Sequence, residues 1–350
     1  MTTLQQIIGL SRLFGLRTLL RRKRRHDQAL PHLRGYVLTQ VLWALTQEGF
    51  LDRLAVTGKL SVAAYAQERN LAGHVLESLC VYLDALKLVD YEDGTCLPRR
   101  RLLDLLAEPR GVFDLAYGYE PIFAALPALL AGTKQVGKDV TRRGDYIAKG
   151  SGELGRQLPF PVMCDLIRGL SAKRVLDLGC GDLEFLMLLA EELPVQCVGI
   201  DKDHAAVAYA EKRLREGSFA DRIEVSETDM FAVGELRRRW GDADVLTAID
   251  VFHEYLFEGE SRIRGLLQDL CRAFPHSALV VAEFCLQPRE RLRRQPTAFV
   301  EHHLFHDLTN QVIVPAARWR TLFRAGGYDV AAERVFDIVG HGYFLLRPTG

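Results

Sequence analysis

The feature that most constrains this chain is a short apolar segment, residues 175–181, that runs directly into two glycines. It reads Val-Leu-Asp-Leu-Gly-Cys-Gly, and its first four residues predict a buried strand. Gly179 and Gly181 predict a tight turn, because glycine adopts positive φ at little cost and lets a ligand approach the backbone. Helical spacing resumes at Glu184, so the free N–H groups of a helix N-terminus would face an anionic group of that ligand.

A second predicted strand ends in an acid about 20 residues further on, which is the spacing that ribose recognition requires. Residues 198–201 read Val-Gly-Ile-Asp, and the carboxylate of Asp201 would accept hydrogen bonds from ribose hydroxyls. A lone Gly-x-Gly is also typical of an ordinary strand-to-helix turn. The strand before it and the acid after it favour a nucleotide-like ligand over that simpler interpretation.

Composition argues against several other classes of protein. Of the 350 residues 48% are apolar, and the formal net charge is zero. We therefore do not expect a disordered chain, nor nucleic acid or a membrane surface as the partner of the whole protein. The seven cysteines form no Cys-x-x-Cys pair, which indicates free thiols and predicts a cytoplasmic protein. No apolar run reaches membrane-spanning length.

Residues 1–105 predict a separate N-terminal domain. Residues 1–30 carry a rough apolar stripe and predict a helical arm, which the basic run at 21–25 closes. That run could contact an anion, a nucleic acid or a membrane. We favour the alternative that it is the cation-rich end of a dimer-swapping helix, because positive charge suits a helix C-terminus.

The rest of this domain predicts a winged helix. The turn signal Asp93-Gly94 joins two short strands into a hairpin. The helices are expected at 37–45, 61–66 and 74–86, and the strands at 88–91 and 95–97. A winged helix often binds DNA through its third helix, but that helix contains acids and a single late lysine here. A helix that lies on phosphates should be basic, so DNA binding is not the favoured function of this domain.

Residues 106–165 predict a linker of helices rich in apolar and aromatic residues. It contains an arginine pair, Arg142 and Arg143. A guanidinium binds a carboxylate through two parallel hydrogen bonds, so either arginine is a candidate for gripping an acidic substrate. A surface salt bridge explains the pair equally well.

Residues 166–350 alternate between predicted strands and helices. This alternation predicts an α/β fold, a doubly wound sheet that ends in an antiparallel hairpin. The strands are expected near 174–178, 196–200, 223–228, 243–248, 277–284, 329–336 and 342–347, and the helices near 184–193, 204–215, 260–273 and 315–326. In such sheets ligands bind beyond the carboxyl ends of the strands.

The first of these motifs resembles that of the class I S-adenosylmethionine-dependent methyltransferases. Asp177, Gly179 and Gly181 stand at its fixed positions, and Leu183 stands where many members have a third glycine. The resemblance implies a Rossmann-like sheet with S-adenosylmethionine as cofactor. It also implies that the winged-helix domain pairs two chains into a homodimer and that the linker helices roof the pocket of a small-molecule substrate.

The same resemblance assigns roles at three more strand ends. Asp201 matches the family's ribose-binding acid, and the pair Asp229-Met230 matches its adenine-binding pair. A helix N-cap is the simpler explanation of Asp229. Asp250 ends the fourth strand, beside the methyl group of the cofactor, and His253 follows where related O-methyltransferases carry their general base.

Three further histidines, His302, His303 and His306, lie after the fifth predicted strand. Imidazole binds iron, zinc, nickel and cobalt, and two histidines that converge from distant segments can begin a metal site. His302 and His303 would share the side of a helix with His306, so either could substitute for it. Ordinary hydrogen-bonded pocket histidines are the alternative.

The histidine pattern resembles the metal-dependent α-keto acid C-methyltransferases of the phenylpyruvate and 2-ketoarginine type. Their two His-acid pairs are matched by His253-Glu254 and His306-Asp307, and their carboxylate-gripping arginine by Arg142, with Arg143 as the alternate register. This resemblance implies a divalent metal such as iron or zinc on His253 and His306. Glu254 and Asp307 would orient the histidines or relay a proton.

We therefore predict C-methylation of the β-carbon of an α-keto acid through a metal-bound enolate. A guanidinium-bearing substrate would require an acid in the roof, and Asp114 and Glu120 are available. One alternative is a metal-independent O-methyltransferase on a small hydroxylated metabolite, with His253 as general base. Another is a DNA-binding regulator with S-adenosylmethionine as effector, which the acidic third helix disfavours.

Overall fold

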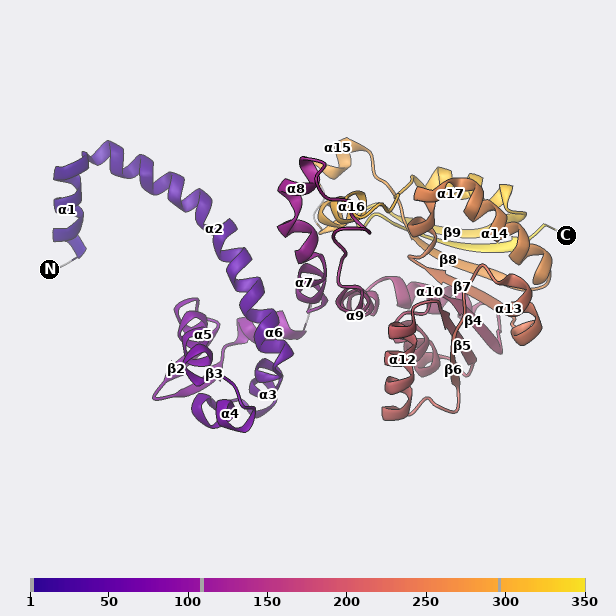
Figure 1. Ribbon diagram of the computed structural model, residues 1–350, viewed down its shortest axis with the longest axis horizontal. Coiled ribbons are helices and arrows are strands. Elements are labelled where there is room, and N and C mark those ends of the chain that lie inside the picture. Colours follow the sequence, from indigo (N-terminus) through magenta and orange to yellow (C-terminus); the bar gives the residue numbers. More distant parts are fainter. Residues whose placement is uncertain (1–2, 108–109, 295–296, 350) are drawn as a thin grey trace. The chain divides into compact units, whose positions relative to one another are not determined.

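The computed structural model describes residues 3–107, 110–294 and 297–349 and divides into two compact units, Met1–Glu108 and Pro109–Gly350 (Figure 1). The first unit contains α1 (Thr3–Phe14), α2 (Leu16–Gln47), α3 (Phe50–Thr57), β1 (Leu60–Ser61), α4 (Val62–Glu68), α5 (Gly73–Ala85), β2 (Val89–Glu92), β3 (Thr95–Pro98) and α6 (Arg100–Ala107).

The second unit begins with the helices α7 (Gly111–Ala124), α8 (Leu126–Leu130), α9 (Gly144–Gly155) and α10 (Pro159–Arg168). It continues with β4 (Arg174–Leu178), α11 (Glu184–Glu192), β5 (Gln196–Asp201), α12 (His204–Glu216), β6 (Ile223–Glu227), α13 (Val233–Trp240), β7 (Val245–Ile249) and the 3₁₀ helix η1 (Phe252–Glu258). It ends with α14 (Glu260–Ala273), β8 (Ala278–Phe284), α15 (Arg289–Leu292), α16 (Phe299–Leu308), α17 (Ala316–Ala325), β9 (Tyr328–Phe336) and β10 (His341–Pro348).

The first unit carries the predicted winged helix. Its strands pair antiparallel in the order β1-β3-β2. Asp93 and Gly94 both have positive φ, 48° and 73°, which is the backbone of the two-residue turn that the dipeptide predicts. Ser61 accepts from the Ala64 amide and caps α4, which explains why that helix begins where it does.

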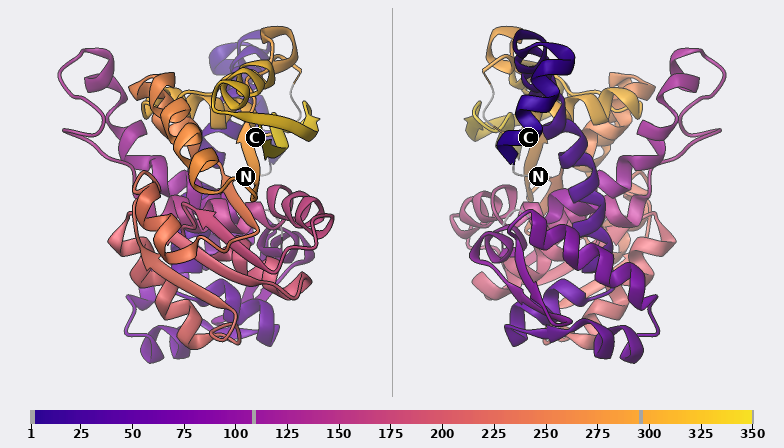
Figure 2. Two further views of the ribbon diagram at one scale, coloured as in Figure 1. Left: turned by 90° about the vertical axis from the view of Figure 1, so that its right-hand side faces the viewer. Right: turned by 90° about the vertical axis from the view of Figure 1, so that its left-hand side faces the viewer.

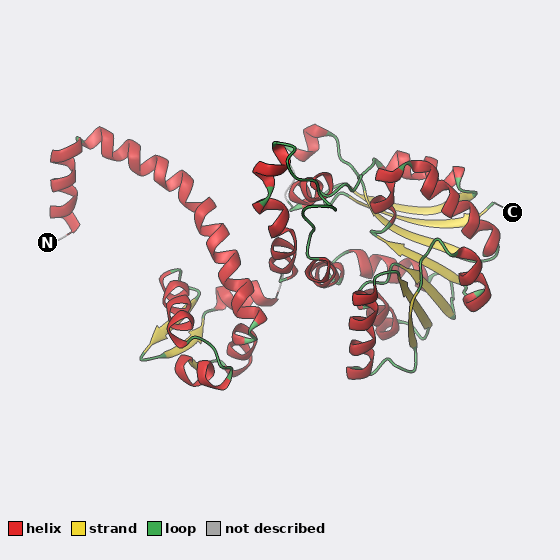
Figure 3. Ribbon diagram, in the orientation of Figure 1, coloured by secondary structure: helices red, strands yellow, loops and turns green. Residues whose placement is uncertain are grey.

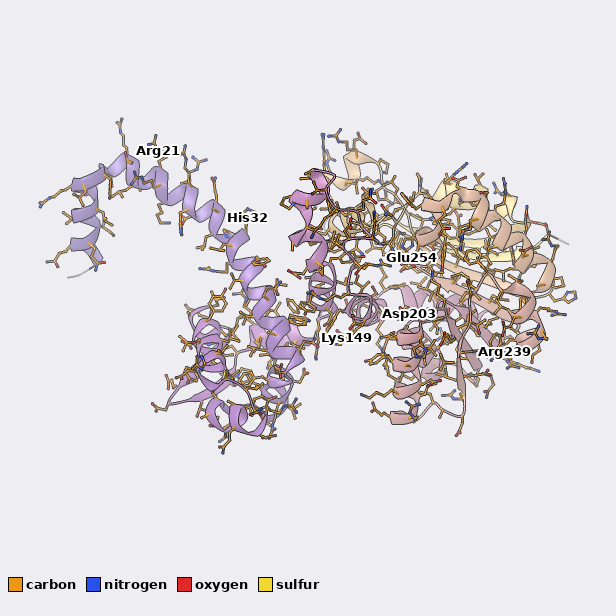
Figure 4. The ribbon with its side chains drawn as sticks, in the orientation of Figure 1. Arg21, His32, Lys149, Asp203, Arg239 and Glu254 are labelled. Carbon is orange, nitrogen blue, oxygen red and sulfur yellow. The ribbon has the colours of Figure 1, made fainter. Side chains whose placement is uncertain are left out.

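The arm differs from the prediction, because α1 covers its first half and α2 runs without a break from its second half into the expected first helix of the winged helix. Pro31 lies within it. The inner end of α2 buries Val41, Leu42 and Leu45, whereas its outer part is exposed (Figure 4, where Arg21 and His32 are labelled). The short helix α3, bounded by the left-handed Gly49 and Gly58, was not predicted.

Among the described residues of the second unit, seven strands form one sheet in the order β6-β5-β4-β7-β8-β10-β9 (Figure 3). The strands from β6 to β8 run parallel, and β10 pairs antiparallel with both β8 and β9. The predicted doubly wound sheet with a terminal hairpin is confirmed. The chain leaves β4 toward one edge and β7 toward the other, so the crevice for a ligand lies beyond the ends of these two strands.

Helices cover both faces of this sheet (Figure 2). Successive strand residues face opposite sides, so Leu176 and Leu246 pack with α13, α14 and α17, while Val175 and Val245 pack with α10, α11 and α12. The helix α13 was not predicted. Within the described residues, no helix is both long and apolar enough to cross a membrane.

Candidate active site

The glycine turn after β4 has the backbone that the sequence predicts. Gly179 and Gly181 have φ of 81° and 52°, and the amides of Gly179 and Cys180 donate to the Ile200 carbonyl at 2.8 and 2.9 Å. A Cβ on Gly179 would lie 2.8 Å from Val251 Cγ2, so no other residue fits there without a shift. Leu183 also has positive φ, 67°, which is the conformation that a third glycine would adopt freely.

Two acids flank this turn. Asp177 is buried, and Thr247 Oγ1 donates to its Oδ1 at 2.6 Å. Burial raises the pKa of Asp177 to about 7. Asp201 ends β5 and accepts from the amides of Gly181 and Asp203 at 3.1 and 2.9 Å, and burial raises its pKa as well. Of the two predicted cofactor acids, Asp177 therefore lies in β4 just before the turn, and Asp201 is hydrogen-bonded to the turn at Gly181.

Asp229 and Met230 follow β6 and behave differently from each other. Asp229 is exposed, and its Oδ1 accepts from the Phe231 amide at 3.0 Å. This is a local turn of the kind that the simpler interpretation requires. Met230 is buried and packs in the core. Phe231 packs edge-on against Tyr255 of η1, with ring centroids 4.9 Å apart.

The two histidines of the predicted metal pair face each other. His253 lies in η1 directly after β7, and His306 lies on α16; both are buried. Their ring centroids are 4.8 Å apart at an angle of 64°. The fold therefore brings together two side chains that are 53 positions apart in the sequence.

Each imidazole is held through its Nδ1 atom. His253 Nδ1 lies 2.8 Å from Glu283 Oε2 on β8, and His306 Nδ1 donates to the His302 carbonyl at 2.5 Å. Glu283 Oε1 also accepts from the Phe252 amide at 2.6 Å. Metal-binding histidines are oriented in this way by a carboxylate or carbonyl on one ring nitrogen, which leaves the other for the metal.

The pKa values of the two histidines are shifted in opposite directions. Burial lowers the pKa of His306 to about 2, assisted by the nearby His253, so this imidazole is neutral. Burial also opposes a charge on His253, but the Glu283 carboxylate outweighs it and raises the pKa of His253. The pKa of Glu283 is raised in turn, chiefly by its own burial.

The predicted arginine pair divides between two partners. Arg142 donates to Glu254 Oε1 at 2.5 Å (Figure 4, where Glu254 is labelled), and thus reaches the residue next to His253. Arg143 instead donates to Glu120 at 3.0 Å and to the Tyr117 carbonyl at 2.7 Å. Of the two registers, only Arg142 contacts η1 among the described residues.

The acids expected to orient the histidines have other partners. Glu254 pairs with Arg142 and also accepts from Gln311 Nε2 at 2.7 Å. Asp307 is exposed and pairs with His303 at 2.9 Å. The groups that hold the histidines are Glu283 and a main-chain carbonyl, because α16 turns Asp307 away from the sheet.

Asp250 also has a partner that sequence reasoning missed. Its backbone has positive φ, 53°, and His341 Nε2 of β10 donates to its Oδ1 at 2.7 Å. Oxygen and nitrogen atoms of Asp250, His253 and Glu283 lie within 4.8 Å of one another. Within this group Glu283 bonds with His253 Nδ1, whereas Asp250 bonds with His341.

Sequence signals for the missed residues were weak. Glu283 is the one acid in the otherwise apolar strand Ala278–Phe284 and is fully buried, which is a signal that a partner must exist. Gln311 and His341 carry no comparable mark, since each follows a loop and contacts a residue more than 50 positions away.

Residues 170–319 match the family model described as methyltransferase domain. The chain is 26% identical to 2-ketoarginine methyltransferase of Streptomyces arginensis over 92% of this chain and 96% of that protein. It is 25% identical to methyltransferase ungE′ of Aspergillus campestris over 68% and 70%.

The fold as a whole is also known. The structure of human N-acetylserotonin methyltransferase, solved in complex with S-adenosylmethionine, superposes with a TM-score of 0.62 at 16% identity, covering 93% of this chain and 98% of that one. The shared architecture includes the N-terminal helical domain. The chain carries a methyltransferase domain over residues 170–319, and it is an S-adenosylmethionine-dependent methyltransferase.

Proposed function

We propose that this enzyme methylates the β-carbon of an α-keto acid. The observation that carries the proposal is the facing pair His253 and His306, each held through Nδ1 with its Nε2 left as a donor atom. A hydroxyl-methylating site needs one base and no second buried, neutral imidazole. The likeness to 2-ketoarginine methyltransferase over nearly the whole chain supports the same reading.

The two histidines fit a divalent metal such as iron or zinc. A metal requires neutral imidazole, and the lowered pKa of His306 keeps that ring neutral at every physiological pH. When bound, the metal would act as a Lewis acid toward the 2-oxo group of the substrate and so acidify the adjacent C–H. Glu283 would hold His253 in the orientation and tautomer that this role requires.

Arg142 supports an acidic substrate. Its side chain is 30% exposed and pairs with Glu254, the neighbour of His253. A carboxylate bound there would lie next to the histidine pair. The carboxylate and the 2-oxo group of an α-keto acid are adjacent in the same way. Arg143 instead holds the helices over the pocket together, because it joins the start of α9 to Glu120 and Tyr117 of α7.

Methyl transfer itself would depend on positioning. The cofactor would lie on the glycine turn with its ribose at Asp201, and Asp250 and His253 follow the neighbouring strand β7. Once the β-carbon has lost its proton to water or a side-chain base, its electron pair would attack the sulfonium methyl, so that a C–C bond forms while the C–S bond breaks and its electrons pass to sulfur. Holding the two reactants in line can lower the barrier by roughly 7 kcal/mol or more.

Within the α-keto acids, the roof favours a neutral substrate side chain. The two acids considered for a guanidinium already have cationic partners. Asp114 is buried and lies 3.1 Å from Lys149 Nζ, and Glu120 pairs with Arg143. Nearby, Tyr119 and Phe123 of α7 pack against Phe305 of α16 with ring centroids 4.4 and 5.5 Å apart. These aromatic rings suit an apolar side chain.

O-methylation of a small hydroxylated metabolite is the second candidate. Glu283 raises the pKa of His253, and a histidine backed by a carboxylate is an effective general base. In this reading His306 is a pocket residue and no metal takes part.

The test is methyl transfer from S-adenosylmethionine to a panel of α-keto acids, with and without EDTA. The panel includes phenylpyruvate, 4-methyl-2-oxopentanoate and 2-ketoarginine. Turnover that EDTA removes and a divalent metal restores supports the proposal, and faster turnover of the two neutral side chains supports the roof argument. Absence of turnover across the panel, with intact cofactor binding, overturns C-methylation in favour of O-methylation.

A further inference from the structure

Gln311 belongs to a network of side chains that surrounds Arg142. Gln311 Nε2 and Arg142 Nη2 both donate to the same oxygen of Glu254, at 2.7 and 2.5 Å. Arg142 and Thr309 both neighbour the Tyr119 hydroxyl and counteract the rise in its pKa that burial causes. Thr309 Oγ1 donates to Gln311 Oε1 at 3.1 Å, so the five side chains form one connected ring of neighbours.

The ring joins segments that are far apart in the sequence. Tyr119 comes from α7 and Arg142 from the loop before α9, whereas Glu254 lies in η1 and the last two members follow α16. All of these segments belong to the second unit. Gln311 is 5% exposed and Tyr119 is 3% exposed, so these two members cannot exchange their partners for water without a cost.

Arg142 retains donors for a further partner. A guanidinium has five N–H donors in a fixed plane. In the part of the chain that the structure describes, its hydrogen bond goes to Glu254, and Tyr119 lies beside it. The side chain remains 30% exposed, so an edge of the guanidinium can still receive a carboxylate from the substrate.

Gln311 decides how Glu254 holds the arginine. A carboxylate and a guanidinium pair most strongly through two parallel hydrogen bonds, which would consume one whole edge of Arg142. Glu254 Oε1 accepts from Gln311 and from a single nitrogen of Arg142, so the carboxylate and the guanidinium are joined by one hydrogen bond rather than by the parallel pair. The orientation of the amide follows as well, since its oxygen would repel the carboxylate whereas its NH₂ group donates to it.

We propose that Gln311 is a positioning residue that, through Glu254, keeps an edge of Arg142 open for the carboxylate of the substrate. This inference rests on the proposed function, because it assumes an acidic substrate beside His253. It assigns the selection of acidic substrates to the Gln311–Glu254–Arg142 chain, of which sequence motifs identify only the last two members.

The test compares Gln311→Leu and Gln311→Glu with wild type, using phenylpyruvate as probe and the purified, metal-containing enzyme. Each variant should raise KM for phenylpyruvate by about tenfold, the effect of losing one hydrogen bond to a charged group. The glutamate variant should have the higher KM of the two, because a second carboxylate competes for Arg142 and repels the acidic substrate. At saturation, kcat should stay within about threefold of wild type, because the bond is present in both ground and transition states.

A double-mutant cycle with Arg142→Met separates this role from a merely structural one. The dissociation constant of phenylpyruvate is measured by calorimetry on the S-adenosylhomocysteine complex. If Gln311 acts through Arg142, adding Gln311→Leu to Arg142→Met should change that constant by less than about twofold. Gln268→Leu is the matched control, since Gln268 is exposed on α14 and donates only to the Ala325 carbonyl among the described residues.

Unchanged phenylpyruvate affinity in both Gln311 variants, or an equal loss with and without Arg142, would overturn the inference. So would a parallel fall in cofactor affinity and Tm, which indicates a structural role. These results leave the proposed function standing as long as wild type methylates α-keto acids. If wild type methylates none of them, the proposed function fails and this inference fails with it.

Discussion

At the scale of single residues, burial controls the ionisation of Asp177 beneath the cofactor turn. Its pKa is raised to about 7, whereas the pKa of an aspartate in an unfolded chain is about 3.9. Between these values the unfolded state has released a proton that the folded state still holds. The stability of the folded state therefore falls as pH rises through this window and then levels off.

Asp177→Asn cannot ionise and should remove that dependence. Its Tm should exceed that of wild type by a margin that grows from about pH 4 to pH 7 and is constant above pH 7. The corresponding gain in the free energy of unfolding is at most about a few kcal/mol. Differential scanning fluorimetry of the cofactor-free protein across this range measures it. Asp93→Asn, in a hairpin turn that accepts either residue, is the control. A margin that does not vary with pH contradicts the assignment.

His306 and His303 offer a matched pair on one helix. His306 is buried against His253, whereas His303 is partly exposed and pairs with exposed Asp307. His306→Ala should lose bound metal, measured by plasma emission spectroscopy, and reduce turnover of α-keto acids by about a hundredfold or more. His303→Ala should retain both. Full activity of the His306 variant would refute the metal site.

The residues that could be predicted from the sequence are those whose neighbours lie close in the chain. The glycine turn and Asp201 form one local unit, because a strand, a turn and a helix start must follow in that order. The partners of the histidines could not be predicted in this way. Glu283 reaches His253 only because β8 pairs with β7, and Gln311 reaches Glu254 only because of the path taken after α16.

At the scale of elements, the predicted strands are close to the observed ones because each is an apolar run with polar ends. The missed helices are short. Both α3 and α13 have eight residues, and the last turn of α13 contains three arginines, so neither helix presents the long apolar stripe that predicts a helix. The second half of the predicted arm and the helix expected at 37–45 belong to the single helix α2, because Pro31 does not end it. Proline removes one hydrogen bond but is not an absolute barrier.

The packing of α7 on α9 depends on glycines. A Cβ on Gly150 would lie 2.7 Å from the Gly111 carbonyl oxygen and 2.9 Å from the Leu115 amide, and both are backbone atoms that cannot swing aside. Gly150→Ala should therefore lower the free energy of unfolding by about 2 kcal/mol or more. Urea denaturation followed by circular dichroism measures this change.

The same helix supplies the control for this prediction. Gly144 begins α9, and a Cβ there meets nothing within 4 Å. Gly144→Ala should be neutral or stabilise by up to about 1 kcal/mol, because alanine loses less conformational freedom on folding. Equal destabilisation by both substitutions would contradict the assignment of the cost to the close approach of α7, because a Cβ on Gly144 has no such neighbour.

At the scale of the whole molecule, the N-terminal arm is a segment that exposes many large apolar side chains. Large apolar side chains along α1 and the start of α2 are exposed, among them Leu13 at 75% and Leu16 at 60%. Apolar side chains gathered in this way mark an interface. The interpretation of the arm as a dimer-forming element, made from the sequence, stays a prediction that this exposure supports.

The oligomeric state decides whether the arm does pair two chains. Wild type should sediment at about twice the 39.4 kDa of one chain, and Leu13→Glu with Leu16→Glu should shift it toward the monomer, because two charges cannot be buried in an apolar contact. Leu130→Glu, on a side chain 88% exposed at the end of α8, introduces the same charge outside the arm and should leave the dimer intact. Wild type that sediments as a monomer at micromolar concentration would exclude the pairing. A dimer that survives the arm substitutions would place the interface elsewhere.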